Sequence, residues 1–147
     1  MYNIGEEEIN AIAEVINSRK LFRYEGDKCL TFEKRYAQYL GAKYFRLTCS
    51  GSSALHAAIV SLGIGPGDEV IIPSHTYMAT AISVLTAGAI PVVIDVDDSI
   101  TMDPDALENS IGPLTKAVIP VHIWGASCNM ETIMRIAEKH NLLVIED

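Results

Sequence analysis

The chain has 147 residues, of which 49% are apolar and 7% aromatic, and its formal net charge is −8. This length suffices for one domain with a real core but not for two domains of ordinary size. The acidic balance argues against nucleic acid as a partner, and no apolar run reaches the roughly 18 residues that a membrane span needs.

The three cysteines, Cys29, Cys49 and Cys128, have no CxxC spacing. They therefore predict neither a disulfide framework nor a zinc site, which favours a reducing compartment. The acidic residues 6–8 are unlike the basic start of a signal peptide. We expect a cytoplasmic protein without a metal site and without a membrane partner.

Two helices are predicted at the start of the chain, joined by a polar linker. Apolar residues recur at helical spacing over Glu6–Asn17, with Ile9, Ile12 and Ile16, and over Thr31–Leu40, with Phe32, Tyr36 and Tyr39. The linker between them is basic and contains glycine, so it is predicted to be exposed.

From residue 44 onward, apolar strands alternate with helices. The predicted strands are Tyr44–Cys49, Glu69–Pro73, Pro91–Val96, Lys116–Ile123 and Leu142–Ile145. Their cores are continuous and β-branched, which is typical of strands buried on both faces. The predicted helices are Ser52–Leu62, Thr76–Ala87, a helix with Asp103 as N-cap, and Met130–His140 between Asn129 and Asn141. This alternation predicts an α/β fold, a three-layer α/β/α sandwich with a mostly parallel sheet.

The last predicted strand ends at "LLVIED" without a helix after it. A parallel strand normally continues into a covering helix, so we expect the chain to be part of a longer protein. Within it, residues 1–43 are expected to form an N-terminal helical segment of the same domain, and residues 44–147 part of a large domain.

The segment Ser50-Gly51-Ser52-Ser53-Ala54 follows the first predicted strand and opens a helix. Ligands bind at the carboxyl ends of parallel strands, and the free N–H groups of a helix N-terminus favour an anion. Gly51, Ser52 and Ser53 are therefore candidates for holding a phosphate. The plain alternative is that Ser50 is only an N-cap and Gly51 only a turn residue.

A second glycine-rich segment, residues 63–69 ("GIGPGDE"), precedes a strand. A dinucleotide-binding loop must follow a strand, so this segment is interpreted as a turn.

Other predicted strands also end in polar or aromatic residues. Tyr77 follows the second strand, His122 lies at the end of the fourth, and Asp147 follows the fifth. Each has a plain alternative: a residue at a helix start, a hydrogen-bonded core histidine, and the N-cap of a further helix. Singly, none of them identifies a function.

Taken together, these segments resemble the DegT/DnrJ/EryC1/StrS family of pyridoxal-phosphate-dependent sugar aminotransferases. The resemblance runs from "IGEEEINAIAEVINS" through "LGIGPGDEVIIPS" to "VIED". It implies the large domain of the type I aminotransferase fold, whose strands, numbered in chain order, lie in the order 3-2-4-5-6-7-1. This chain would supply strands one to five of the seven.

The resemblance also implies roles for residues of the strand-end loops. Gly51, Ser52 and Ser53 match the family's phosphate-binding segment and would hold the phosphate of pyridoxal 5′-phosphate. The ring of Tyr77 would stack on the cofactor's pyridine, and Asp147 would keep the pyridine nitrogen protonated. Arg23, in the basic linker, and His122 are candidates for binding the substrate, although a solvated basic loop remains the plain interpretation of the linker.

For the full-length protein, the resemblance implies transfer of an amino group, with glutamate as the expected donor, to a keto-sugar nucleotide. Such reactions serve cell-surface polysaccharide or secondary-metabolite sugar biosynthesis, and a homodimer is expected. The lysine that forms a Schiff base with the cofactor would lie beyond residue 147, and none of the six lysines present lies on a strand-end loop. The chain alone is therefore expected to be inactive. A sugar dehydratase of the same fold and a non-catalytic fragment or pseudoenzyme remain as alternatives.

Overall fold

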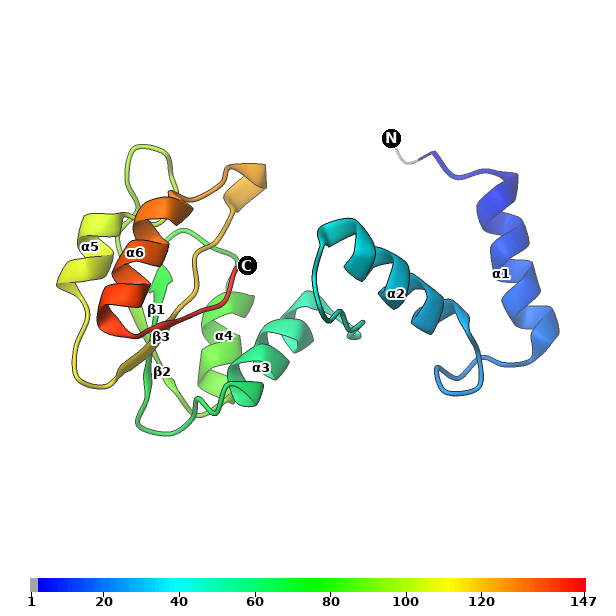
Figure 1. Cartoon of the computed structure of the whole chain (residues 1–147), viewed down its shortest axis with the longest axis horizontal. Helices are drawn as coiled ribbons and strands as arrows, with labels where there is room; N and C mark the ends of the chain where they lie inside the picture. The colour runs from blue at the N-terminus through cyan, green and yellow to red at the C-terminus, as the bar shows by residue number, and fades with distance from the viewer. Residues whose placement is uncertain (1–2) are drawn as a thin grey trace. The chain divides into compact units, whose positions relative to one another are not determined.

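The computed structural model describes residues 3–147 and divides the chain into two compact units, with the boundary between Leu47 and Thr48 (Figure 1). The first unit contains the helices α1 (Glu6–Ser18) and α2 (Lys28–Leu40), and the second contains all the strands. The two predicted N-terminal helices are confirmed. The assignment of residues 1–43 to the same domain as the rest stays a prediction.

The sheet of the second unit has four parallel strands: β1 (Glu69–Pro73), β2 (Ile90–Ile94), β3 (Thr115–Val118) and β4 (Leu143–Val144). Their spatial order is β2-β1-β3-β4. This order confirms the sequence-based expectation for the second to fifth predicted strands. Since all four strands run the same way, the loops that follow them gather at one edge of the sheet.

Four α-helices and one 3₁₀ turn accompany these strands. They are α3 (Gly51–Ser61), α4 (Ala79–Thr86), α5 (Pro104–Asn109), η1 (Ile123–Gly125) and α6 (Met130–His140); α3 precedes β1, and the others lie between strands. The predicted caps are present: the side chains of Asp103 and Asn129 accept backbone N–H bonds at the starts of α5 and α6, and Asn141 is left-handed after α6. The segment interpreted as a turn closes with the Asp68 N–H donating to the Gly65 carbonyl, 3.1 Å away.

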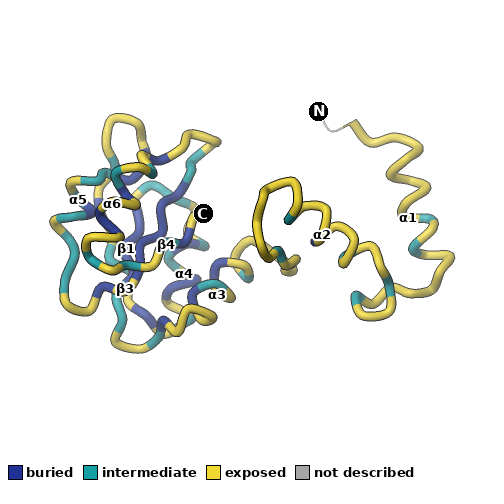
Figure 2. The backbone as a smooth tube through the Cα atoms, viewed as in Figure 1, coloured by how far each residue is buried: buried dark blue, intermediate teal, exposed yellow. Residues whose placement is uncertain are grey.

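The helices cover the two faces of the sheet, which gives the predicted α/β/α sandwich (Figure 1). Alternate residues of β1 show the division: Val70 and Ile72 pack with α3 and α4, whereas Ile71 packs with α5 and α6. The tube view shows the strands as the buried centre between exposed helix surfaces (Figure 2). The β1 strand is buried on both sides because a parallel sheet needs a covering layer on each face.

The prediction of a strand at Tyr44–Cys49 was wrong. These residues have no regular structure, and Tyr44 is exposed. A strand needs a paired backbone, and no strand within residues 3–147 pairs with this segment. The Leu47 N–H donates instead to the carboxylate of Glu33, 2.8 Å away.

The predicted strand at Lys116–Ile123 was too long, because β3 ends at Val118. Pro120, which has no N–H to donate, follows two residues later. The helix predicted from Thr76 starts later, at Ala79. Neither difference moves a loop to the other edge of the sheet.

The first unit buries little of its apolar surface. On α1, the stripe formed by Ile9, Ile12 and Ile16 is exposed, and none of the residues of this helix is buried. On α2, the buried residue is Glu33. In the part of the chain that the structure describes, no helix is both long and apolar enough to cross a membrane.

The two layers of the second unit lead to a test on α6. Ile136→Ala should lower the free energy of unfolding by about 2–5 kcal/mol, because Ile136 is buried in the core between α6 and the sheet. Met134→Ala on the same helix should change it by less than about 0.5 kcal/mol, since Met134 is exposed. Urea unfolding followed by circular dichroism measures both, and equal losses would contradict the layer assignment.

Candidate active site

Loops after β1, β3 and β4 meet at the carboxyl edge of the sheet, where a ligand is expected in a parallel fold. The loop after β1 carries Tyr77, the loop after β3 carries His122, and the segment after β4 ends at Asp147. The hydrogen bonds of the sheet continue into these loops: the Asp147 N–H donates to the Pro120 carbonyl (3.0 Å), and the His122 N–H donates to the Asp147 carbonyl (2.9 Å).

At the start of α3, Ser50 is an N-cap, as the plain interpretation expects, and Gly51 is the first residue of the helix. The hydroxyl of Ser50 accepts the Ser53 N–H at 3.1 Å, so the expectation that the Ser53 N–H is free was wrong. The N–H groups of Gly51 and Ser52 have no acceptor within the described chain. These two N–H groups remain available to an anion at the positive end of the helix dipole.

The side chains around this helix start form a small polar cluster. The hydroxyl of Ser53 lies 3.0 Å from that of Ser50 and 3.1 Å from the Cys49 sulfur. A side chain on Gly51 would meet nothing within 4 Å, so the space beside its Cα is open. The hydrogen bond to Ser53 is the main cause that holds the pKa of the Cys49 thiol below its usual 9.0.

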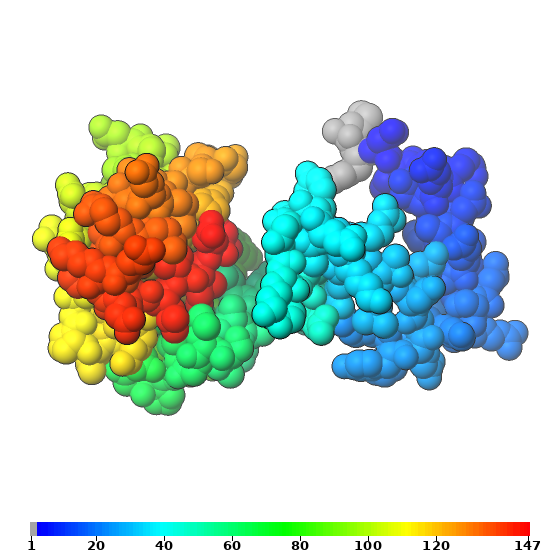
Figure 3. Space-filling view, viewed as in Figure 1, coloured from blue at the N-terminus to red at the C-terminus, as the bar shows by residue number. Residues whose placement is uncertain are grey.

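The carboxylate of Asp147 is exposed but held in place. Its Oδ2 accepts a hydrogen bond from the hydroxyl of Thr80, 2.5 Å away, while Oδ1 has no partner among the described residues. The space-filling view shows the C-terminal residues at the surface, beside the segment that contains α3 and α4 (Figure 3). The carboxylate therefore has one oxygen fixed to the protein and one available.

Helix α4 connects this carboxylate with the start of α3. Thr80, in its first turn, binds Asp147, and the hydroxyl of Ser83 lies 3.3 Å from the Ser52 carbonyl. At a rise of 1.5 Å per residue, Thr80 and Ser83 are about 4.5 Å apart along the helix axis. The structure thus brings the serine-rich turn and Asp147 to the same helix.

Sequence reasoning missed Thr80 as a functional residue. The signal is a hydroxyl on the buried face of a helix, since Thr80 and Val84 are both fully buried and four residues apart. A buried hydroxyl needs a hydrogen-bond partner, so a threonine on the buried face of a helix predicts a specific polar contact.

Tyr77 precedes α4, and its side chain is 80% exposed. Its carbonyl accepts the Thr80 N–H at 3.1 Å, which places Tyr77 next to the Asp147 contact in the chain. The next loop contributes a second exposed ring, that of Trp124, which lies edge-on to His75 at 5.4 Å between ring centres. The Nε2 of His75 is buried and has no partner among the described residues.

Both ring nitrogens of His122 are engaged. Nδ1 accepts the Cys128 N–H at 3.2 Å, so in the neutral ring Nε2 carries the proton and donates it to the Glu146 carboxylate, 2.9 Å away. The histidine is hydrogen-bonded, as the plain interpretation expects, but it is half-buried and not part of the core. Any substrate contact by the ring would have to replace one of these bonds.

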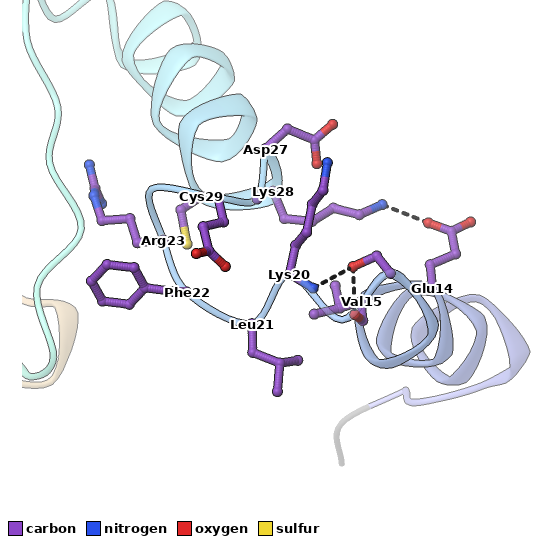
Figure 4. A pocket seen from close by; sticks show the side chains of 12 residues that line it. Glu14, Val15, Lys20, Leu21, Phe22, Arg23, Asp27, Lys28 and Cys29 are labelled. Atoms are coloured by element: carbon purple, nitrogen blue, oxygen red, sulfur yellow. Dashed lines mark hydrogen bonds and ion pairs between the residues drawn. The ribbon is translucent and has the colours of Figure 1, made fainter.

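Arg23 lies in the first unit, on the linker between α1 and α2. Its guanidinium pairs with the buried carboxylate of Glu33 at 2.8 Å. The surrounding linker forms a hollow of about 680 Å³ with mixed charges, in which Lys28 pairs with Glu14 at 2.7 Å (Figure 4). The linker is mostly exposed, as predicted, and two of its four basic residues, Arg23 and Lys28, pair with acidic neighbours.

Glu33 organises the first unit. It accepts the Leu47 N–H and faces the guanidinium groups of Arg23 and Arg46. The Leu47 N–H, followed by Arg23, holds the pKa of Glu33 below its usual 4.5. No three His, Cys, Asp or Glu side chains gather as metal ligands within residues 3–147.

Comparison with known proteins supplies the family. The model of the DegT/DnrJ/EryC1/StrS aminotransferase family matches residues 2–147. The chain is 51% identical over 117 residues to the GDP-perosamine synthase of Caulobacter vibrioides, covering 79% of this chain and 32% of the relative. It is 43% identical over 145 residues to the spore coat polysaccharide biosynthesis protein SpsC of Bacillus subtilis, covering 98% of this chain and 37% of the relative.

Among solved structures, NtdA of Bacillus subtilis with bound cofactor PMP matches with a TM-score of 0.91 and 36% identity. The match covers 97% of this chain and 34% of NtdA. The chain thus spans about a third of the length of the curated relatives that it matches.

The role of Glu33 predicts a pH effect on stability. Because its pKa is lowered by folding, the stabilisation is present above the unfolded-state value near 4.5 and is lost as the pH falls through the folded-state value. Glu33→Gln should therefore lower the melting temperature at neutral pH and flatten its decline in acid, as measured by circular dichroism. Glu14→Gln, which removes an exposed pair, should leave both unchanged. An unaltered acid decline in Glu33→Gln would exclude this role.

The polar cluster before α3 predicts a reactive thiol. Cys49 should be alkylated by iodoacetamide at neutral pH before Cys29 and Cys128, since it is exposed and its pKa is lowered. Ser53→Ala should slow the reaction several-fold, because the thiolate loses its main hydrogen-bond donor. Mass spectrometry of time points measures the rate at each cysteine. Ser61→Ala, at the far end of α3, is the control, and an equal rate in Ser53→Ala would refute the assignment.

Proposed function

Because the chain belongs to the DegT/DnrJ/EryC1/StrS aminotransferase family, we propose that it forms the cofactor-binding part of a pyridoxal-phosphate-dependent aminotransferase. The full-length protein transfers an amino group, with glutamate as donor, to a keto-sugar nucleotide. The geometry of α4 carries this proposal: one helix contacts both the segment at the start of α3 and the carboxylate of Asp147.

The names of the relatives support the substrate class. One is a GDP-perosamine synthase and another a spore coat polysaccharide biosynthesis protein, and both align with most of this chain. An aminated sugar linked to a nucleotide, used for a cell-surface polysaccharide, fits both names. We therefore assign a keto-sugar nucleotide as acceptor, rather than a free amino or keto acid.

The start of α3 fits the phosphate of the cofactor. The N–H groups of Gly51 and Ser52, which have no partner within residues 3–147, lie at the helix N-terminus, and the hydroxyls of Ser52 and Ser53 belong to the same turn. The space beside the Cα of Gly51 is open. These donors are what an anionic group requires, and no carboxylate belongs to the serine-rich turn. Gly51, Ser52 and Ser53 are accordingly assigned to the phosphate.

The opposite end of the site fits a cationic ring nitrogen. Asp147 offers one free carboxylate oxygen, and a carboxylate favours the protonated form of a nitrogen that it contacts. The exposed ring of Tyr77, a few residues before Thr80, is assigned to stacking on the cofactor. The chain thus has a donor set for an anion and an acceptor for a ring N–H⁺, which are the two polar ends of pyridoxal phosphate.

The bound cofactor supplies an electron sink that accepts the negative charge formed when the substrate loses a proton. The residues of this chain position it and set its charge state. Asp147 holds the proton on the ring nitrogen, and the start of α3 anchors the phosphate. A lysine for the covalent bond is assigned to the part of the protein outside this chain.

His122 and Arg23 remain candidates for binding the substrate. Each already has an acidic partner, Glu146 and Glu33 respectively, so either contact would require an exchange of partners. We further propose a homodimer in the cytoplasm. The cytoplasmic assignment is supported by the free state of Cys29, Cys49 and Cys128.

The proposal is tested with Asp147→Asn in the full-length protein. The variant should keep much of its cofactor, because the phosphate site is intact, but should convert the cofactor to its amine form with glutamate at least about a hundredfold more slowly. Absorbance spectroscopy after rapid mixing follows this single turnover.

Glu138→Gln is the matched control. It makes the same change of charge on an exposed carboxylate near the end of α6 and should react at nearly the original rate. Nearly normal turnover of Asp147→Asn would remove Asp147 from the site. If the unaltered full-length protein bound no cofactor, the proposed function as a whole would be refuted.

A further inference from the structure

Two threonines connect the start of α4 to Asp147. The hydroxyl of Thr80 is 2.5 Å from Oδ2 of Asp147 and 2.8 Å from the hydroxyl of Thr76. Thr80 is fully buried, and it is separated from Asp147 by 67 positions in the chain. Only the tertiary fold brings these groups together.

The direction of the hydrogen bonds follows from the number of protons. An ionised carboxylate has none to give, so the hydroxyl of Thr80 donates its single proton to Asp147. Its oxygen can then only accept, and the proton between the threonines comes from Thr76. The alternative acceptor for Thr76, the Tyr77 carbonyl, is farther away at 3.4 Å. The chain of donors therefore runs from Thr76 through Thr80 to Asp147.

The buried hydroxyl of Thr80 has two partners, since it accepts from Thr76 and donates to Asp147. For Asp147 the contact matters because its side chain is exposed and would otherwise change rotamer freely.

The main chain of Asp147 is also fixed. Its N–H and carbonyl are bonded to Pro120 and His122. With Oδ2 bound by Thr80, the carboxylate is held in one orientation, and Oδ1 is the oxygen left without a partner among the described residues.

We propose that Thr80 is a positioning residue that directs Oδ1 of Asp147 toward the ring nitrogen of the cofactor, with Thr76 as the donor behind it. The proposal rests on the proposed function, since it concerns the same site. Thr80 does not touch the reacting atoms. It sets the orientation of the group that keeps the ring nitrogen protonated, and a carboxylate that is fixed before the cofactor binds needs no reorganisation afterwards.

The fold explains why α4 provides this residue. Thr80 lies in the first turn of a helix that packs on the sheet, so its side chain is buried at the carboxyl edge, where β4 delivers Asp147. Three residues later, Ser83 lies against the Ser52 carbonyl. A displacement of α4 would thus disturb both ends of the cofactor site together.

The test compares Thr80→Val, Thr80→Ala and Thr80→Ser in the full-length protein loaded with pyridoxal phosphate labelled with ¹⁵N in the ring. In the unaltered protein and in Thr80→Ser, the nitrogen resonance should show a protonated ring. In Thr80→Ala and Thr80→Val it should move toward the neutral value that Asp147→Asn reaches. Since Thr80→Ala and Thr80→Ser differ by one hydroxyl oxygen, this pair isolates the hydrogen bond.

A double-mutant cycle separates positioning from a merely structural role. Thr80→Ala should slow the reaction with glutamate roughly tenfold to a hundredfold when Asp147 is present, as expected for a hydrogen bond to a charged group. In the Asp147→Asn background the same change should cost less than about twofold, because there is no carboxylate left to orient. An equal cost in both backgrounds would overturn the proposal.

Thr86→Val is the matched control on the same helix. Its hydroxyl binds the Ile82 carbonyl within α4, so the substitution should leave the resonance and the rate unchanged. The proposed function and the role of Thr80 can be refuted separately. An unaltered protein that binds no cofactor would refute the proposed function, whereas normal binding with an unchanged resonance in Thr80→Ala would refute only the role of Thr80.

Discussion

The parallel pairing of β1 with β2 on one side and β3 on the other is the constraint on which the second unit depends. Parallel strands cannot be joined by short turns, so each connection has to cross a face of the sheet, and helices do this. The same constraint leaves the turns after β1, β3 and β4 at one edge. The same topology therefore produces both the core and the candidate site, because helices that cover the apolar strands also carry polar residues at that edge.

Helix α4 illustrates this double role. Val84 packs in the core with β1, while Thr80 and Ser83 on the same helix contact Asp147 and the Ser52 carbonyl. These polar contacts join segments that are far apart in the sequence. In the proposed function, a core helix that contacts both ends of the cofactor site would preorganise that site.

Ser50 and His122 both have an ordinary structural role, and both lie close to residues of the proposed site. Ser50 is an N-cap, yet the cap leaves the Gly51 and Ser52 N–H groups without a partner in the described chain. His122 is a hydrogen-bonded histidine, yet it lies on a loop at the binding edge. Capping uses one donor of a helix start that has several, so the cap does not compete with the proposed phosphate-binding role.

The sequence alone determined the order and type of the elements in the second unit. Continuous β-branched strands, the caps at Asp103 and Asn129 and the left-handed Asn141 act over a few residues, and each was recognisable locally. The order of the strands came from the family resemblance. The structure alone decided that residues 44–49 form no strand, because pairing depends on a partner elsewhere. It also decided that Glu33 binds Arg23 and that Thr80 binds Asp147. Those contacts join side chains whose proximity is set by the path of the whole chain, which no local pattern contains.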